Sequence, residues 1–328
     1  MTIDNSVELD SFFTDTDPTR RVKGAQAPVL VLMDAKGGVG TSTLSLCAAE
    51  LAATAGGVKR VTVVDACQDT GDLRLMMRTA ERLPTVHTAA LRRDPRLATI
   101  GPDRLNGARP AHVPTVGFGM ILAPGHGQSS ASTPHDYAQA IRAVREVSDL
   151  VIVDAGSVVP AANSKMAEIL LVPMLRSGFW SLVVADSTQA GVRNALALMN
   201  SLSALDVPRD RTMSVINKVR PSIGTEGADR MSEAMTKLSI PVGWIEHDDK
   251  EIGDRMELGT IPHDHPQIAV ALSKVLLRVT GRGAFEPVAN ATIDRKGRVR
   301  EAAPVASAAS AADAKSRTKM KLPSFGKK

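Results

Sequence analysis

Residues 34–43 of this chain read Asp-Ala-Lys-Gly-Gly-Val-Gly-Thr-Ser-Thr, and this stretch decides the expected fold. It follows a short apolar run, Val29–Met33, and precedes a helix-like segment, Ser42–Ala53, whose apolar residues share one face. Glycines let backbone N–H groups approach phosphate oxygens without a Cβ in the way, and the helix N-terminus adds partial positive charge. An ordinary glycine-rich turn is the alternative, but this position favours a phosphate loop. The residues expected to bind a nucleotide are Gly37, Gly38, Val39, Gly40, Thr41, Ser42 and Thr43.

From Pro28 onward, short β-branched runs alternate with longer segments of helical period, which is typical of βαβ units. The sequence therefore predicts an α/β fold: a doubly wound, mostly parallel sheet with helices on both faces, as in P-loop NTPases. The expected strands are Val29–Met33, Val61–Val64, Phe118–Leu122, Val151–Val153, Leu182–Ala185, Met213–Ile216 and Val242–Ile245. The expected helices are Ser42–Ala53, Tyr137–Val147, Asn163–Leu175, Val192–Leu205, Gly227–Leu238 and Pro266–Val279.

The charge of the chain is unevenly distributed along its 328 residues, although the formal total is only +5. Residues 283–328 carry ten Lys and Arg against four Asp and Glu, whereas residues 1–26 carry three against five. The interval 27–282 is close to neutral, with 27 basic and 26 acidic residues. We therefore expect a flexible acidic leader (1–26), one P-loop domain (27–282), and an Ala/Ser-rich linker followed by a basic tail (283–328).

Composition excludes several classes of protein. The two cysteines are too few for a disulfide framework or a four-thiolate metal site, and no apolar run approaches the ~20 residues of a membrane span. The acidic N-terminus lacks the basic region of a secretory signal. With two Trp, one Tyr and six Phe, the chain offers few platforms for stacking single-stranded bases. These features favour a soluble cytoplasmic protein.

The loop at 36–42 resembles the ParA/MinD branch of P-loop ATPases, whose deviant Walker A loop reads KGG-x-G-K-[ST] with an additional early lysine. On this resemblance Lys36 is the signature lysine, which in the family reaches the nucleotide of the partner subunit in an ATP-sandwiched homodimer. Ser42 matches the hydroxyl that binds Mg²⁺. Thr41 departs from the pattern, because it stands where the family has a lysine that places its charge on the β- and γ-phosphates. The resemblance implies ATP and Mg²⁺ as cofactors.

The strand expected at 61–64 resembles the family's strand that ends in Asp-x-Asp. Asp65 matches the first aspartate, and Cys67 replaces the second, which in the family helps to position the attacking water. We expect Cys67 to be a small, partly buried thiol, with Asp69 or Asp72 as a weak candidate for the lost carboxylate. Residues 68–72 also resemble the Q-x-G-D stretch of the CpaE/TadZ pilus-localisation subgroup, whose loops often lack the second lysine.

Two further strand ends carry residues that match the family. Asp154 ends a strand that resembles the Walker B strand, in which it would hold Mg²⁺ through water together with Ser42. Asn217 matches an asparagine that hydrogen-bonds adenine, with a strand-end turn residue as the alternative. The catalytic residues implied by the resemblance, which covers roughly residues 27–280, are Lys36, Asp65 and Asp154.

Two polar features have no assigned role in this scheme. We interpret His263, Asp264 and His265 as surface residues rather than a metal pair, because adjacent loop residues rarely converge. The basic residues of 315–328 belong to a solvated tail or contact DNA phosphates or anionic lipid. Pro323 argues against a long amphipathic membrane helix there.

The resemblance implies one of two functions. In the first, the chain is an ATP-binding protein that positions or partitions a cellular cargo, such as pilus or secretion machinery, a division site or DNA, with weak or absent hydrolysis. The replacements at Thr41 and Cys67 favour this function, because losing one charge-stabilising donor typically costs ~10²–10³ in rate. In the second, it is an active DNA-partition ATPase that cycles on the nucleoid. The expected partners are a second copy of the chain and a protein cargo or polar scaffold.

Overall fold

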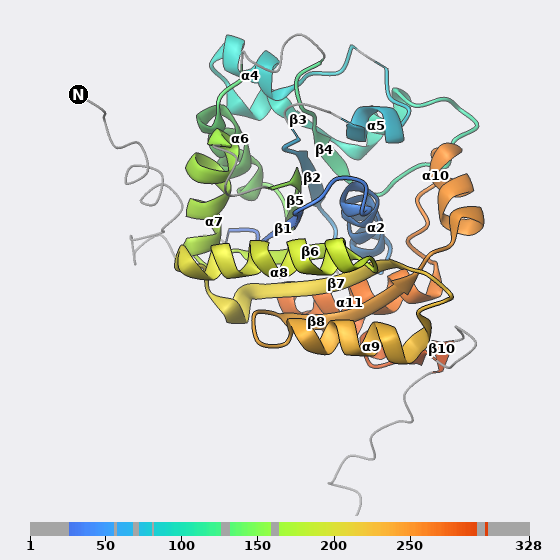
Figure 1. Ribbon diagram of the computed structural model, residues 1–328. Helices are drawn as coiled ribbons and strands as arrows, with labels where there is room; N and C mark the ends of the chain where they lie inside the picture. The colour runs from blue at the N-terminus through green and yellow to red at the C-terminus, as the bar shows by residue number, and fades with distance from the viewer. Residues whose placement is uncertain are drawn as a thin grey trace, which may run out of the picture.

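Strand β1 (Val29–Asp34) is buried along its full length and lies inside an eight-stranded sheet (Figure 1). The structure is a computed structural model that describes residues 26–55, 58–67, 72–80, 82–125, 132–158, 164–293 and 299–300. The strand order is β3-β4-β2-β5-β1-β6-β7-β8, and only the β3–β4 pair is antiparallel. The other strands are β2 (Val61–Asp65), β3 (Thr99–Ile100), β4 (Gly119–Ile121), β5 (Leu150–Ser157), β6 (Trp180–Asp186), β7 (Thr212–Val219) and β8 (Ile240–Glu246).

The direction in which the chain builds the sheet reverses next to β1. Strands β2 to β5 lie on one side of β1, and β6, β7 and β8 follow one another on the other side. Strand β1 therefore pairs with β5 along one edge and with β6 along the other, in parallel register. Ligands of open α/β sheets bind outside the carboxyl ends of the strands at such a reversal.

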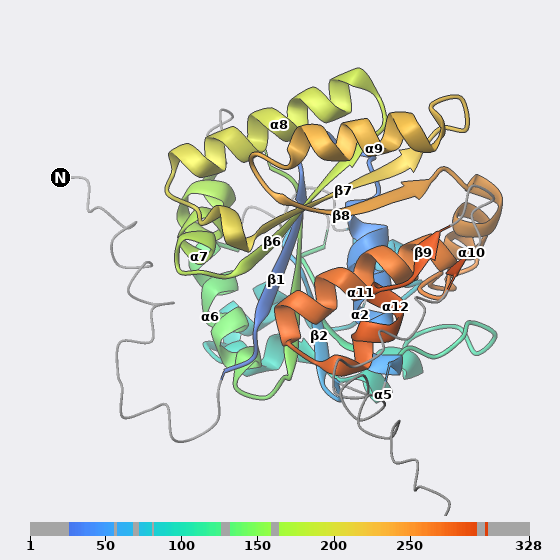
Figure 2. The same cartoon turned by 90° about the horizontal axis from the view of Figure 1, so that it is seen from below.

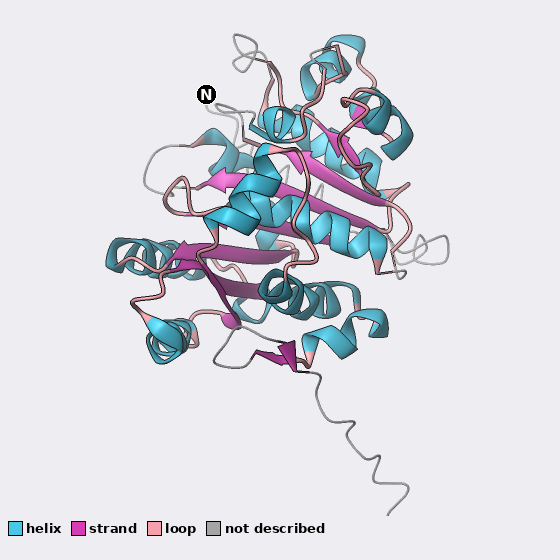
Figure 3. Cartoon of the chain, turned by 90° about the vertical axis from the view of Figure 1, so that its right-hand side faces the viewer, coloured by secondary structure: helices cyan, strands magenta, loops and turns pink. Residues whose placement is uncertain are grey.

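Helices cover both faces of the sheet, because the buried strands present apolar side chains to both sides (Figures 2 and 3). Along β1, Val31 and Met33 enter one core, and Leu30 and Leu32 enter the other. The first core includes residues from α4 (Val86–Arg92), α6 (Pro134–Arg145), α7 (Val172–Arg176), α8 (Gln189–Ala204) and α9 (Gly224–Met235). The second includes residues from α2 (Thr41–Thr54), α3 (Asp72–Met76), α5 (Pro102–Gly107) and α11 (Pro266–Thr280), with α10 (Asp254–Glu257) at its border.

This architecture confirms the predicted doubly wound, mostly parallel α/β sheet with helices on both faces. All seven expected strands are present within a few residues of their predicted ends. The two-residue edge strand β3 and the short helices α3, α4 and α5 were not predicted, because each is too short to show a periodic pattern. In the described part of the chain, no helix is both long and apolar enough to cross a bilayer.

The helix expected at 163–175 differs in form. A π-helix spans Met166–Leu171, and α7 continues from Val172 to Arg176. Pro173 lies at the start of α7 and has no N–H to donate, and a proline ring clashes with the carbonyl four residues earlier in a regular α-helix. The amide of Val172 accordingly bonds Ala167 O, five residues back, which is the π pattern.

The packed part of the chain extends beyond residue 282, where we expected the linker and tail to begin. Phe285, Ala289 and Ala291 are buried, with a short helix, α12 (Glu286–Ala289), against α11. Strands β9 (Thr292–Ile293) and β10 (Val299–Arg300) form a separate antiparallel pair. Residues 1–25 of the predicted leader and the predicted basic segment 315–328 lie outside the described residues.

Candidate functional site

The glycine-rich loop joins the carboxyl end of β1 to α2 at the reversal point of the sheet. Gly38 and Gly40 have φ values of 81° and 99°, a left-handed conformation that L side chains rarely adopt. A Cβ at Gly40 would also overlap the Asn217 amide. Both the backbone conformation and the close approach of Asn217 therefore require glycine at this position. A cavity of about 580 Å³ lies over the loop and is lined by loop residues and by the ends of β2 and β5. Of the residues predicted to bind a nucleotide, Gly37, Gly38, Gly40, Thr41, Ser42 and Thr43 line it. Val39 is buried in the core, and neither Val39 nor Asn217 lines the cavity.

A buried carboxylate at the base of the loop holds the Thr41 side chain. Asp34, the last residue of β1, is 3% exposed, and its Oδ2 accepts a 2.5 Å hydrogen bond from Thr41 Oγ1. Its Oδ1 accepts hydrogen bonds from Ser157 Oγ at 2.5 Å and from the Lys36 amide at 3.0 Å. Thr41 therefore binds a negative charge at the position where the resembling family carries a lysine. Sequence reasoning did not single out Asp34, although an acidic residue that ends the strand before such a loop is a visible signal.

Asp154 lies next to Asp65 across the β2–β5 pair, and both carboxylates are buried. Neither oxygen of Asp154 makes a hydrogen bond of ordinary geometry within the described residues. Burial raises the pKa of this carboxyl to about 6, although the Ser42 hydroxyl and the Gly156 amide act in the opposite direction. A buried carboxylate beside a serine hydroxyl is an all-oxygen donor set, which suits Mg²⁺. Ser42 and Asp154 therefore fit the ion that the resemblance implies.

Lys36 does not line the cavity, and its side chain extends to Asp186 at the end of β6. Its Nζ lies 2.9 Å from Asp186 Oδ2, and its side chain is 44% exposed. Burial alone would raise the pKa of Asp186, but hydrogen bonds from Thr188 and Lys36 lower it below its ordinary value. In this single chain the predicted signature lysine is thus paired within its own subunit.

Two consecutive residues at the end of β7 bind the loop backbone. Asn217 Nδ2 donates to Val39 O, and Lys218 Nζ donates to Gly38 O, each at 2.8 Å. The register of β7 against β8 shifts between Ile216 and Val219, and Lys218 has a φ of 54°. This local irregularity turns Lys218 toward the loop, where it lines the cavity. Sequence reasoning identified Asn217 but gave no role to Lys218, the basic residue that follows it.

Cys67 lines the cavity from the segment after β2. Its amide donates to Asp65 Oδ1 at 3.2 Å, and its Sγ lies 3.7 Å from Asp154 O. The thiol is partly buried, as expected. Residues 68–71, and with them the candidate Asp69, lie outside the described residues, and nothing is described of the Asp72 side chain.

The carboxyl edge of the sheet is acidic overall. Strands β1, β2, β5 and β6 each bring an aspartate to it, and Lys36 and Lys218 are the cations described above. The four aspartates are Asp34, Asp65, Asp154 and Asp186. Binding of a phosphate chain here therefore requires an additional cation, because like charges in a partly buried site repel strongly.

Comparison with known proteins found likeness in structure only: no family model and no curated protein matches this chain. Among solved structures, a chain of the MinC:MinD cell division protein complex of Aquifex aeolicus matches with a TM-score of 0.60 and 17% identity, over 78% of this chain and 97% of that one. A ParA family ATPase of Chlorobium tepidum matches at 0.54 and 16%, over 79% and 95%. The septum site-determining protein MinD of Pyrococcus horikoshii, complexed with Mg-ADP, matches at 0.54 and 15%, over 80% and 95%.

At these identities the likeness shows the fold alone. The sheet order, the glycine-rich loop after β1 and these structural neighbours define the chain as an α/β protein with the P-loop NTPase fold of the MinD and ParA ATPases.

Proposed function

We propose that this chain binds ATP with Mg²⁺ in the cavity over the glycine-rich loop and acts as a ParA/MinD-like positioning protein with weak hydrolysis. The observation that carries the proposal is the Thr41–Asp34 hydrogen bond at the base of an otherwise complete phosphate loop. The loop retains glycines in the left-handed conformation, a helix N-terminus and the Ser42–Asp154 donor set. It lacks the ammonium that would stabilise charge developing on the β- and γ-phosphates, so binding is retained and turnover is slow.

The residue roles follow from this arrangement. Ser42 and Asp154 would hold Mg²⁺, which supplies the positive charge that the acidic edge of the sheet requires, and Asp65 would support that site from the neighbouring strand. The backbone of Gly37–Thr43 would bind the phosphates. Asn217 would border the base, since its amide already lies against the loop. Lys36 would act across a homodimer interface once it leaves Asp186.

The proposed partners are a second copy of the chain, bound in an ATP-dependent manner, and a protein cargo or polar scaffold in the cytoplasm. MinC:MinD and ParA among the neighbours support this class of function by analogy of fold. Likeness to the CpaE/TadZ subgroup rests on the loop and on residues 68–72. Contact of the basic segment 315–328 with DNA or anionic membrane is a proposal from charge alone.

A second candidate is an active DNA-partition ATPase. The presence of Lys36 in the expected loop position favours it, because that lysine serves catalysis in the resembling family. The paired aspartates Asp65 and Asp154 also favour it. Measured turnover separates the two candidates.

The test is ATP affinity and turnover of the full chain beside a Thr41→Lys, Cys67→Asp double variant. We expect micromolar-range ATP binding with little turnover in the parent and a clear gain in the double variant. A third variant adds Asp34→Asn, because the Asp34 carboxylate would otherwise pair with the introduced ammonium. Robust turnover in the parent that none of the variants changes would contradict weak hydrolysis. No ATP or ADP binding at millimolar concentration would contradict the nucleotide-binding role itself.

A further inference from the structure

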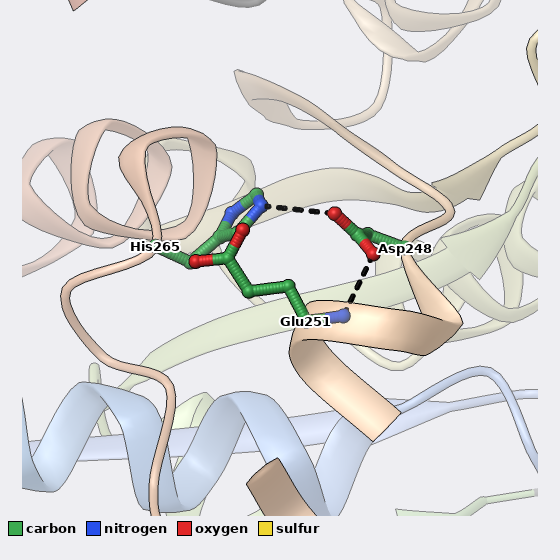
Figure 4. A group of neighbouring side chains, drawn as sticks. All are labelled: Asp248, Glu251 and His265. Carbon is green, nitrogen blue, oxygen red and sulfur yellow. Dashed lines mark hydrogen bonds and ion pairs between the residues drawn. The ribbon is translucent and has the colours of Figure 1, made fainter. Parts of the chain in front are cut away.

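Three potential metal ligands converge between β8 and α11, in a part of the molecule that the proposed nucleotide site does not use. Asp248 follows β8, Glu251 lies in the single-turn π-helix Asp249–Gly253, and His265 immediately precedes α11. One ligand atom from each of the three lies within 4.8 Å of the other two, and the side chains face one another (Figure 4). None of the three lines the cavity over the glycine-rich loop.

The histidine ring lacks the partners that a buried imidazole needs. His265 is 7% exposed, and its Nδ1 is buried without a hydrogen bond. Its Nε2 faces Asp248 Oδ2 at 4.0 Å, which is beyond hydrogen-bond distance (Figure 4). Buried polar side chains are almost always hydrogen-bonded or bound to a metal. The ring therefore faces the Asp248 carboxylate across 4.0 Å, while its Nδ1 has no hydrogen-bond partner among the described residues.

The two carboxylates are oriented but not neutralised. Asp248 Oδ1 accepts a 2.8 Å hydrogen bond from the Glu251 amide, which directs Oδ2 toward the histidine. The Nη1 of Arg255 lies 4.0 Å from Glu251 Oε1. The other terminal nitrogen of Arg255 is paired with Asp264 at 2.6 Å. Two carboxylates and one imidazole thus share a space in which the described residues place no closely bound cation.

We propose that Asp248, Glu251 and His265 bind one divalent transition-metal ion, with Zn²⁺ as its probe. A mixed set of one nitrogen and two oxygens suits Zn²⁺ better than Mg²⁺ or Ca²⁺, which prefer oxygen ligands throughout. Metal–ligand distances near 2.1 Å place adjacent ligand atoms ~3–3.5 Å apart, so the three atoms approach one another by about 1 Å on binding. The exposed Glu251 side chain can make most of this movement.

The expected consequence is structural. The ion would connect the segment after β8 to the N-terminus of α11, two parts of the chain that this π-helix and α10 separate. The burial of His265 corrects our interpretation of it as a surface residue, whereas Asp264 is exposed as expected. The residues that converge on His265 are Asp248 and Glu251, not its sequence neighbours.

The test uses full-length protein without a histidine tag, stripped of metal and titrated with Zn²⁺ and Co²⁺ in the absence of nucleotide. We expect one Zn²⁺ per chain, a rise in Tm on binding, and Co²⁺ absorption bands that Zn²⁺ abolishes. Zn²⁺ affinity should fall at least about tenfold in Asp248→Asn and in His265→Gln. Asparagine is also a good N-cap, so Asp248→Asn keeps the hydrogen bond to the Glu251 amide and should fold.

Asp249→Asn and His263→Gln are the matched controls, because both residues neighbour the cluster without belonging to it. Both should bind Zn²⁺ as the parent does. The proposal is overturned if the parent fails to bind Zn²⁺, or if the cluster variants bind it as tightly as the parent. Loss of binding only in a Cys67→Ser, Asp154→Asn variant would assign the ion to the loop cavity instead, which likewise overturns the proposal.

Discussion

At residue 41 a hydroxyl replaces the ammonium expected from the loop pattern, and the structure gives the physical reason why it can. Thr41 Oγ1 donates to Asp34, whose carboxylate also receives Ser157 and the Lys36 amide. Asp34 therefore organises the loop through three hydrogen bonds. It also adds negative charge where phosphates would bind. The same residue supports the loop and weakens its attraction for a nucleotide.

Asp34→Asn should increase the affinity for ATP with Mg²⁺. The amide keeps the shape of the carboxylate and can still pair with Thr41 and Ser157, while one buried negative charge is removed. We expect a gain of about tenfold, roughly 1.4 kcal/mol. Calorimetric titration at constant Mg²⁺ measures it, with Asp103→Asn, an exposed residue of α5, as control. Weaker ATP binding by Asp34→Asn would contradict this prediction. It would show that the support which the carboxylate gives to the loop outweighs its repulsion of phosphate.

Asp154→Asn should stabilise the chain without Mg²⁺ in a pH-dependent way. The pKa of Asp154 is about 6 in the folded chain, above its ordinary value of 3.8, so the protonated form is favoured in the fold. Stability is therefore lost as pH rises from about 4 through 6, by up to roughly 3 kcal/mol. The variant carries no such penalty, because asparagine does not ionise. The difference in the free energy of unfolding between variant and parent should therefore be small at pH 4 and largest above pH 7.

Urea unfolding in EDTA at several pH values measures this difference. Adding Mg²⁺ and ATP should make the parent more stable than the variant, because the variant lacks the carboxylate that would hold the ion. A pH-independent difference between parent and variant would contradict the buried, perturbed carboxylate.

At the scale of elements, the site is assembled where strands end and helices begin. Helix α8 starts beside the Lys36 pair, with Thr188 as its N-cap, and Asp186 accepts hydrogen bonds from the Thr188 amide and hydroxyl. Gly191, in the first turn of α8, lies against the Asp186 carboxylate and backbone carbonyl. The absence of a side chain at Gly191 is what allows the end of β6 and the start of α8 to approach so closely.

Gly191→Ala should destabilise the chain and displace Asp186 from Lys36. A Cβ there would overlap the Asp186 carboxylate and lie 2.9 Å from its backbone oxygen, which cannot move without shifting β6. We expect a cost of about 1–3 kcal/mol from overpacking, against a gain below 1 kcal/mol from helix propensity. Thermal or urea unfolding measures it. Gly107→Ala, in α5 with open space around it, is the control and should be neutral or slightly stabilising; equal effects at both positions would refute the close approach.

At the scale of the whole molecule, the Lys36–Asp186 pair bears on the proposed homodimer. Lys36 is exposed enough to leave Asp186, yet in the single chain it is bound at 2.9 Å. A homodimer that shares nucleotide across its interface would exchange this contact for one with the partner's phosphates. In the proposed dimer, the strength of the internal pair would therefore set part of the free-energy cost of dimerisation.

Asp186→Asn should promote an ATP-dependent dimer. The amide oxygen can still accept from the Thr188 amide, so the start of α8 is retained, while the charge that holds Lys36 is removed. Exposed or partly exposed ion pairs contribute up to about 1 kcal/mol each, and the dimer would break two of them, so we expect a shift of up to about thirtyfold in the dimerisation constant. Analytical ultracentrifugation with and without ATP measures it, and Asp186→Asn combined with Lys36→Ala should abolish the gain. Monomers under all conditions would contradict the proposed dimer.

Much of the fold and part of the site could be predicted from sequence. Sequence patterns alone indicate the apolar strand and the helix that flank the glycine-rich loop. The positions of Asp154 and Asn217, after later apolar runs, are visible in the same way. The short helices between β2 and β4 carry too few residues for such a signal, and the π-helix before α7 reflects a local consequence of Pro173. Buried packing of Phe285 also escaped prediction, because the segment 283–291 is too short to show a helical period.

The sequence by itself determined the architecture, since hydrophobic periodicity and glycine spacing are local properties that fix where strands, helices and the loop form. Only the tertiary structure decided what the polar residues bind. Residues far apart in sequence, such as Lys36 and Asp186 or Lys218 and Gly38, meet because parallel strands bring their carboxyl ends to one edge. Packing of the segment after β8 beside the start of α11 likewise places His265 next to Asp248 and Glu251, while its sequence neighbours His263 and Asp264 lie outside that cluster. Hydrogen bonds and charges act at contact distance, and contact distance is set by the fold.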